Sequence, residues 1–110
     1  MKIFKELKKL GYKHYTEHTV EELDDLPLNS AERISEQALV LRWFREKYNL
    51  IPNIHSIYSD ETHTEIKFWF WFGNYEDDSD DEVFYGTYEE AELACLKKLI
   101  EIVKNDNTNN

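Results

Sequence analysis

The alternation of apolar and polar positions predicts helices in both halves of the chain and strands between them. Two short helices come first, each with an apolar residue at every third position: Phe4, Leu7 and Leu10, then Val20, Leu23 and Leu26. Gly11 is suited to end the first helix, and Pro27 stops the second. These residues predict an N-terminal helical segment over residues 1–28.

Two longer helices are predicted over about residues 31–48 and 88–104. The core face of the first is expected to be Ile34, Ala38, Leu41, Phe44 and Tyr48, and that of the second Tyr88, Ala91, Cys95, Leu99 and Ile102, widened by Leu96, Ile100 and Val103. Leu39 and Trp43 lie on nearly the opposite side of the first long helix. A helix with two apolar faces packs between two partners, here the sheet and the N-terminal segment.

Three capping boxes, each a cap residue followed three positions later by Glu, mark where helices begin. They are Thr19–Glu22, Asn29–Glu32 and Thr87–Glu90. They predict that the second, third and last helices start at these positions. Asn49, before Pro52, is expected to end the third.

Strands are predicted between the two long helices. The segment NIHSIYS alternates loosely, and TEIKFWFWF alternates with a period of two. In the second strand Ile66, Phe68, Phe70 and Phe72 point to one side, and Glu65, Lys67, Trp69 and Trp71 point to the other. Asp60–Thr62 is expected to form the turn between these strands, and EVFY a third strand after an acidic loop.

The elements together predict an α+β domain with an α-β-β-β-α core and a three-stranded antiparallel sheet. Residues 1–104 form one domain, in which the segment 1–28 packs on the core 29–104, and residues 105–110 are a disordered tail. Phe68, Phe70 and Phe72, which we call the Phe row, are expected in the core. Trp69 and Trp71 are either covered by the N-terminal helices or exposed to solvent.

Charge narrows the possible partners. The net charge is −10, and Glu76–Glu82 contains six acidic residues in seven positions. Such a surface repels nucleic acid and attracts basic proteins. One cysteine and the absence of a long apolar run predict a cytoplasmic protein.

No stretch of the sequence is a strong catalytic motif. HYTEH, from His14 to His18, has the H-x-x-E-H order of inverted zinc peptidases, but Gly11 and the Thr19 cap flank it, which predicts a polar connector. The acidic loop lacks the glycine and ligand spacing of a calcium-binding EF-hand. Cys95 is expected to be a core residue. We therefore expect no enzyme activity, cofactor or specific metal site.

Two resemblances go beyond the residue patterns. The order helix–strand–strand–strand–helix over about residues 31–104 is similar to that of double-stranded RNA-binding domains, but Glu89, Glu90 and Glu92 stand where that family places basic residues. ALVLRWFREKYNL and TYEEAELACLKKLIEIVKN resemble segments of short uncharacterised proteins of bacteriophages and mobile elements. This resemblance implies an accessory protein of a mobile element. A small, acidic, single-domain chain without a motif also resembles phage inhibitors of host nucleases, including anti-CRISPR proteins.

The leading hypothesis is a phage binding protein, monomer or dimer, that inhibits a host defence nuclease in the host cytoplasm by occupying its basic nucleic-acid-binding surface. The predicted contact residues are the acidic and aromatic ones: Glu76, Asp77, Asp78, Asp80, Asp81, Glu82, Asp24, Asp25, Trp43, Trp69 and Trp71. One alternative is an RNA-binding module that stacks bases on an aromatic sheet face, with the basic N-terminus contacting phosphate. The other is a self-associating phage structural or chaperone-like protein that uses the Trp face as a dimer contact.

Overall fold

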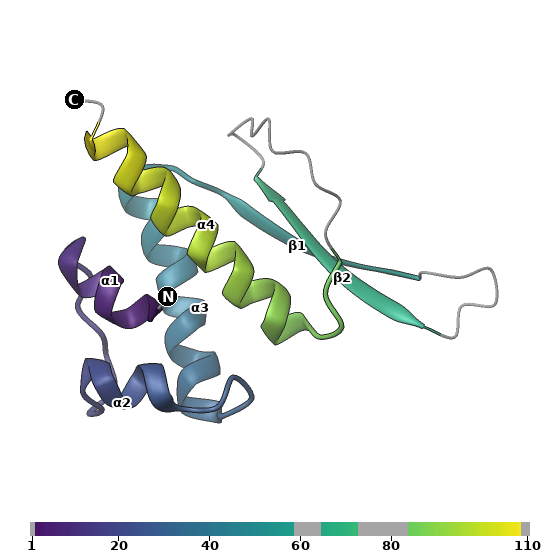
Figure 1. Ribbon diagram of the computed structural model, residues 1–110, viewed down its shortest axis with the longest axis horizontal. Helices are drawn as coiled ribbons and strands as arrows, with labels where there is room; N and C mark the ends of the chain where they lie inside the picture. Colours follow the sequence, from purple (N-terminus) through teal and green to yellow (C-terminus); the bar gives the residue numbers. More distant parts are fainter. Residues whose placement is uncertain (1, 59–64, 73–83, 109–110) are drawn as a thin grey trace.

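The computed structural model describes residues 2–58, 65–72 and 84–108, which form helices and an antiparallel pair of strands (Figure 1). The elements in chain order are α1 (Ile3–Lys9), α2 (Val20–Asp25), α3 (Ala31–Tyr48), β1 (Pro52–Tyr58), β2 (Ile66–Phe72) and α4 (Tyr88–Thr108). The fold is therefore α+β, as predicted from the sequence.

The ends of α1 and α2 lie where the sequence placed them. Gly11 follows α1 with a φ of +102°, a conformation that glycine adopts without strain. Thr19 and Glu22 form the predicted capping box of α2, since the Thr19 hydroxyl accepts from the Glu22 N–H at 3.1 Å while the Glu22 carboxylate bonds back to Thr19.

The ends of the long helices are confirmed with one correction. Ser30, not Asn29, caps α3, because its hydroxyl accepts from the Arg33 N–H at 3.3 Å. Asn49 ends α3 in the left-handed conformation, with a φ of 55°. Thr87 caps α4 by accepting from the Glu90 N–H at 3.1 Å. The predicted disordered tail is partly wrong, because α4 continues beyond residue 104 to Thr108.

Strands β1 and β2 pair antiparallel, from Pro52 opposite Phe72 to Tyr58 opposite Ile66. The predicted turn at 60–62 lies outside the described residues. Of the predicted third strand, only its last two residues are described. Tyr85 forms a bridge with Phe68 through two backbone hydrogen bonds of 2.7 and 2.9 Å. The described part of the chain therefore shows a two-stranded sheet and one bridge beside β2.

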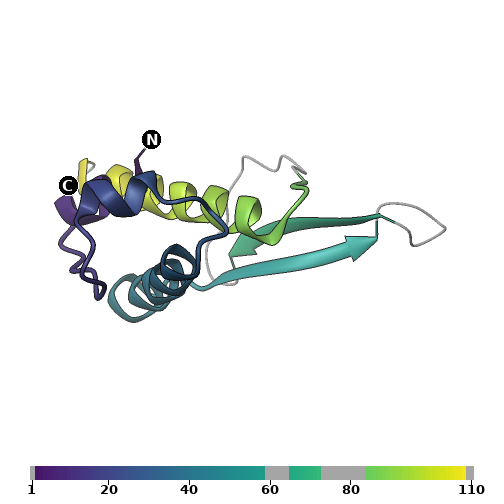
Figure 2. The same cartoon turned by 90° about the horizontal axis from the view of Figure 1, so that it is seen from below.

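Helix α4 packs against both strands, on the face that carries the Phe row (Figures 1 and 2). Phe72 is buried and Phe70 packs against the core, but Ile66 is exposed near the end of the hairpin farthest from the helices. The prediction that α3 packs between the sheet and the N-terminal segment is wrong. Instead α4 is the helix packed against both strands, and α1 and α3 pack against α4.

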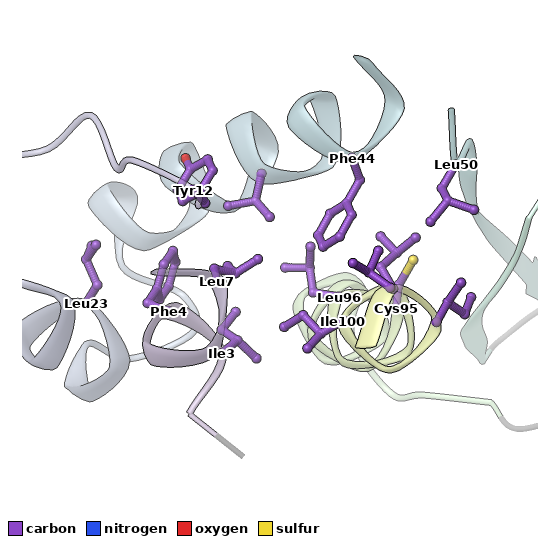
Figure 3. Close-up of a cluster of buried hydrophobic side chains, with 14 of the residues drawn as sticks. Ile3, Phe4, Leu7, Tyr12, Leu23, Phe44, Leu50, Cys95, Leu96 and Ile100 are labelled. Atoms are coloured by element: carbon purple, nitrogen blue, oxygen red, sulfur yellow. The ribbon is translucent and has the colours of Figure 1, made fainter. Parts of the chain in front are cut away.

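The main hydrophobic core lies among the helices (Figure 3). Most of its buried side chains come from three helices: Ile3, Phe4 and Leu7 of α1, Val40 and Phe44 of α3, and Cys95, Leu96, Leu99 and Ile100 of α4. Tyr12, between α1 and α2, and Leu23 of α2 close one end of this core. A buried Leu or Phe contributes about 1.5–3 kcal/mol of transfer free energy, so this cluster is the main source of stability.

The predicted core face of α3 was wrong by one position along most of the helix. Ile34 and Ala38 are exposed, and the buried residues are Arg33, Glu36, Gln37, Val40 and Phe44. The apolar pattern missed this face because three of its five residues are polar. The core face of α4 was largely right, but Glu92 is buried and Tyr88 is exposed.

Candidate binding surface

The side of the sheet opposite α4 carries an exposed group of stacked rings. The period of two in β2 places Trp69 and Trp71 on this side, and the pairing of His55 with Trp69 places His55 beside them. We call these three residues the aromatic face. Trp71 is 44% exposed, His55 is exposed and Trp69 is half-buried. The N-terminal helices pack on α4 instead, so they do not cover these rings (Figure 2).

His55 holds the aromatic face together. Its ring stacks on Trp69 with the centroids 5.1 Å apart, and lies nearly parallel to Trp71, at 5° and 5.8 Å. The Trp71 Nε1–H donates to His55 Nε2 at 2.6 Å. Because an indole N–H can only donate, Nε2 of His55 accepts and Nδ1 carries the ring proton. Trp71 is therefore held by both a ring contact and a hydrogen bond.

Two neighbours extend this surface along the hairpin. Ile57, in β1, is 40% exposed, and Lys67 lies opposite it in β2. Lys67 Nζ pairs with the Glu65 carboxylate at 2.9 Å, which partly neutralises the ammonium. The surface thus has aromatic and aliphatic side chains beside a paired Lys and Glu. Aromatic residues are enriched at the centre of protein interfaces, and polar residues form their rim.

Trp43 belongs to a different cluster from the other two tryptophans. It packs edge-on against Tyr12, Phe44 and Tyr48 at centroid distances of 5.0–5.4 Å, and Lys47 Nζ lies 5.1 Å from its ring centroid. The structure therefore brings Trp69 and Trp71 together but gives Trp43 a role in packing α3 against the segment after α1.

The two predicted acidic contact residues of α2 have different environments. The Asp24 carboxylate accepts from the Phe4 N–H at 2.8 Å and from the Lys5 N–H at 3.1 Å, so it caps α1, which has no cap side chain of its own. Asp25 is exposed. The acidic residues Glu76, Asp77, Asp78, Asp80, Asp81 and Glu82 lie outside the described residues.

The segment HYTEH is not helical, so His14 and His18 do not share the helix face that the H-x-x-E-H pattern requires. The Glu36 carboxylate accepts from the Tyr15 and Thr16 N–H groups at 3.0 Å and from the Tyr12 hydroxyl. These bonds fix the connector between α1 and α2 in an irregular path. His18 pairs with Glu22 at 3.2 Å. Within residues 2–58, 65–72 and 84–108, no three His, Cys, Asp or Glu side chains are placed to bind one metal ion.

A second cluster of buried polar side chains connects α2, α3 and α4. Arg33 donates to the carbonyl oxygens of Asp24 and Leu26 at 3.1 and 2.7 Å and to Gln37 Oε1 at 2.9 Å. Gln37 Nε2 donates to Glu92 Oε1 at 2.7 Å. Burial raises the pKa of Glu92, although the Gln37 bond opposes the shift.

Cys95, one turn after Glu92, is fully buried in the core. Burial and the nearby Glu92 carboxylate raise the pKa of the thiol, which keeps it protonated and unreactive at neutral pH. Its role is in packing, as the apolar pattern of α4 indicated.

Sequence reasoning missed His55 and the four buried polar residues of α3 and α4. His55 could have been found from the strand register, because any residue opposite Trp69 must share its face. The buried polar residues carry no comparable signal, since a polar residue on a helix usually faces solvent.

Comparison of the sequence with protein-family models and curated proteins, and of the structure with solved structures, found no match. In the part of the chain that the structure describes, no helix is both long and apolar enough to span a bilayer.

Proposed function

We propose that this chain is a non-enzymatic binding protein that docks its aromatic face on a basic surface of a partner protein. The observation that supports the proposal is the stack of His55, Trp69 and Trp71 on the side of the sheet that α4 leaves open. Exposed large rings gathered on one surface of a small domain are typical of an interaction site, where a partner removes them from water.

Charge supports a basic partner. The chain has a net charge of −10, and six acidic residues follow β2 within ten positions of Phe72. Exposed carboxylates speed the encounter with a positively charged surface, and buried rings then hold the complex. The aromatic face and the acidic run would therefore act at different stages of binding.

For the identity of the partner, we propose a host defence nuclease with a nucleic-acid-binding channel, such as a CRISPR effector in the cytoplasm. The support is the resemblance of residues 38–50 and 87–105 to phage proteins, together with the charge. An acidic protein that covers such a channel competes with nucleic acid phosphates for the same Lys and Arg side chains. No catalytic group of this chain is needed for such inhibition.

The test is inhibition of purified CRISPR nucleases, each loaded with its guide RNA. We expect the protein to slow target cleavage by at least one nuclease, and replacing both Trp69 and Trp71 with Ala to weaken inhibition at least about tenfold, as for interface hot spots. Ile34→Ala, which truncates an exposed Ile on α3 away from the sheet, is the control and should inhibit like the wild type. Equal inhibition by the double variant would exclude the aromatic face as the docking surface.

The acidic run is tested by the kinetics of association with an inhibited nuclease. Changing Glu76, Asp77, Asp78, Asp80, Asp81 and Glu82 to Gln or Asn should slow association at low salt and leave dissociation nearly unchanged, because exposed charges act mainly on the encounter. If association is equally fast in both proteins, the acidic run serves solubility and not binding.

Single-stranded RNA is the alternative partner that one observation favours, because stacked rings on a sheet bind bases in many RNA-binding domains. The net charge opposes it. A gel shift with single-stranded RNA at low salt, in which binding is lost with both Trp residues, would favour this alternative over the protein partner.

A further inference from the structure

We infer that the aromatic face recognises arginine side chains of its protein partner. This inference rests on the proposed function and names the chemistry of the contact. It follows from what the rings of this chain already bind, from which hydrogen-bonding group of the face is already used, and from the charge of the whole protein.

Cations of this chain lie over ring faces at two places. Lys47 Nζ lies 5.1 Å from the Trp43 ring centroid, and the Arg33 guanidinium lies 5.8 Å from that of Phe4. Both distances are within the range of favourable cation–π contact. Over the described residues, by contrast, no Lys or Arg lies over the ring of Trp69 or Trp71. Trp69 and Trp71 therefore differ from Trp43, whose ring is in contact with a lysine of the same chain.

The aromatic face is held in place before any partner arrives. His55 stacks on Trp69 and lies parallel to Trp71, and the Trp71 N–H is already donated to His55. The most polar group of Trp71 is therefore used internally, and its exposed surface is mainly the indole ring. Such a surface offers π electrons and apolar contact, and rings that are already ordered lose little entropy on binding.

Arginine matches this surface better than the other candidates. Its guanidinium is planar, stacks parallel on aromatic rings and is more weakly hydrated than an ammonium group, so it is desolvated at lower cost than lysine. An RNA base would bring phosphates, and a second copy would bring another charge of −10, toward a chain that already carries −10. A cationic side chain is attracted by the same net charge.

The experiment compares three peptides of equal length in which Ser alternates with Arg, with Lys or with citrulline, the neutral analogue of arginine. Binding to the full-length protein is followed by calorimetry at low and moderate salt. We expect the Arg peptide to bind about three- to tenfold more tightly than the Lys peptide, the range expected from one or two cation–π contacts, and the citrulline peptide more weakly than both.

Replacing both Trp69 and Trp71 with Leu tests the site, because Leu keeps the surface apolar and removes the π electrons. This variant should bind the Arg and Lys peptides equally, while Ile34→Ala should keep the wild-type preference. Circular dichroism verifies that each variant is folded, and if the Leu variant is not, the single change Trp71→Leu should reduce the preference for Arg by itself.

Three results would overturn the inference. They are equal affinity for Arg and Lys peptides in the wild type, a preference for Arg that persists without the two indoles, and binding of single-stranded RNA or dimerisation that depends on them. The two proposals can fail separately. Selective binding of the Arg peptide without inhibition of any nuclease would contradict the proposed partner alone, and inhibition through the aromatic face without a preference for Arg would contradict this inference alone.

Discussion

At the scale of single residues, buried polar side chains determine how this small domain is assembled. Glu36 is fully buried in α3 and accepts hydrogen bonds from the Tyr12 hydroxyl and from two backbone N–H groups of the connector before α2. The Glu36 bond is one cause of the raised pKa of Tyr12, after burial. One carboxylate therefore fixes a segment that has no regular secondary structure of its own.

Glu36→Ala should lower the free energy of unfolding by about 2–4 kcal/mol, because it leaves a buried hydroxyl and two N–H groups without their acceptor. Glu46→Ala, on the same helix, is the control. It removes only an exposed pair with Arg42 and should cost less than about 0.5 kcal/mol. Urea unfolding measures both, and a loss for Glu36→Ala as small as that of the control would show that water satisfies these donors.

At the scale of elements, the short helices depend on one another. Helix α1 has only seven residues, too few to be stable alone, and its first turn is capped by Asp24 at the other end of the N-terminal segment. Helix α2 is in turn held by α3, because Arg33 donates to the carbonyl oxygens of Asp24 and Leu26 at the end of α2. Each short helix is thus stabilised by a side chain from another element.

Asp24→Ala should cost about 1 kcal/mol of stability, as loss of a helix cap does. It should also speed hydrogen exchange at the Phe4 and Lys5 amides, the two donors it leaves unpaired. Asp25→Ala removes an equal charge from the adjacent residue and should change neither the stability nor the exchange of these amides. Exchange rates that are alike in the two variants would mean that Asp24 does not cap α1 in solution.

The elements also show what a sequence can and cannot predict. Strong periodicity and caps located α1, α2, α3 and α4 to within a few residues, because Gly11, Thr19, Asn49 and Thr87 have local roles that depend on few neighbours. The alternation in β2 correctly separated the Phe row from Trp69 and Trp71. The buried face of α3 was missed, because Arg33, Glu36 and Gln37 are buried only through partners distant in the sequence, such as Asp24, Tyr12 and Glu92.

At the scale of the whole molecule, the helices form the main core and the hairpin extends away from it (Figure 2). Helix α4 links the two parts, since one side of it packs among the helices and another contacts the Phe row of the sheet. The stability of the entire domain therefore depends on α4, which also carries the buried Glu92.

Stability should fall as the pH rises through the pKa of Glu92. Burial raises that pKa in the folded state, so the folded protein binds the proton more tightly than the unfolded chain does. This contribution is fully present below the usual pKa of a glutamate and is lost above the raised one. Glu92→Gln keeps an acceptor for Gln37 and removes the charge, so it should be more stable than the wild type at pH 8 and similar to it near pH 4. Urea unfolding across this range, with the exposed Glu101→Gln of the same helix as the control, should show the difference only for Glu92→Gln.

The central claim is that the sheet has one face in the core and another free for a partner, and urea unfolding of two neighbouring variants tests it most directly. Phe72 is 8% exposed and Trp71 is 44% exposed. Phe72→Ala should cost about 3–5 kcal/mol, as truncation of a buried Phe does, and Trp71→Ala less than half of that. Equal losses for the two variants would show that the aromatic face is buried in solution, which would contradict both the binding surface and the proposals that rest on it.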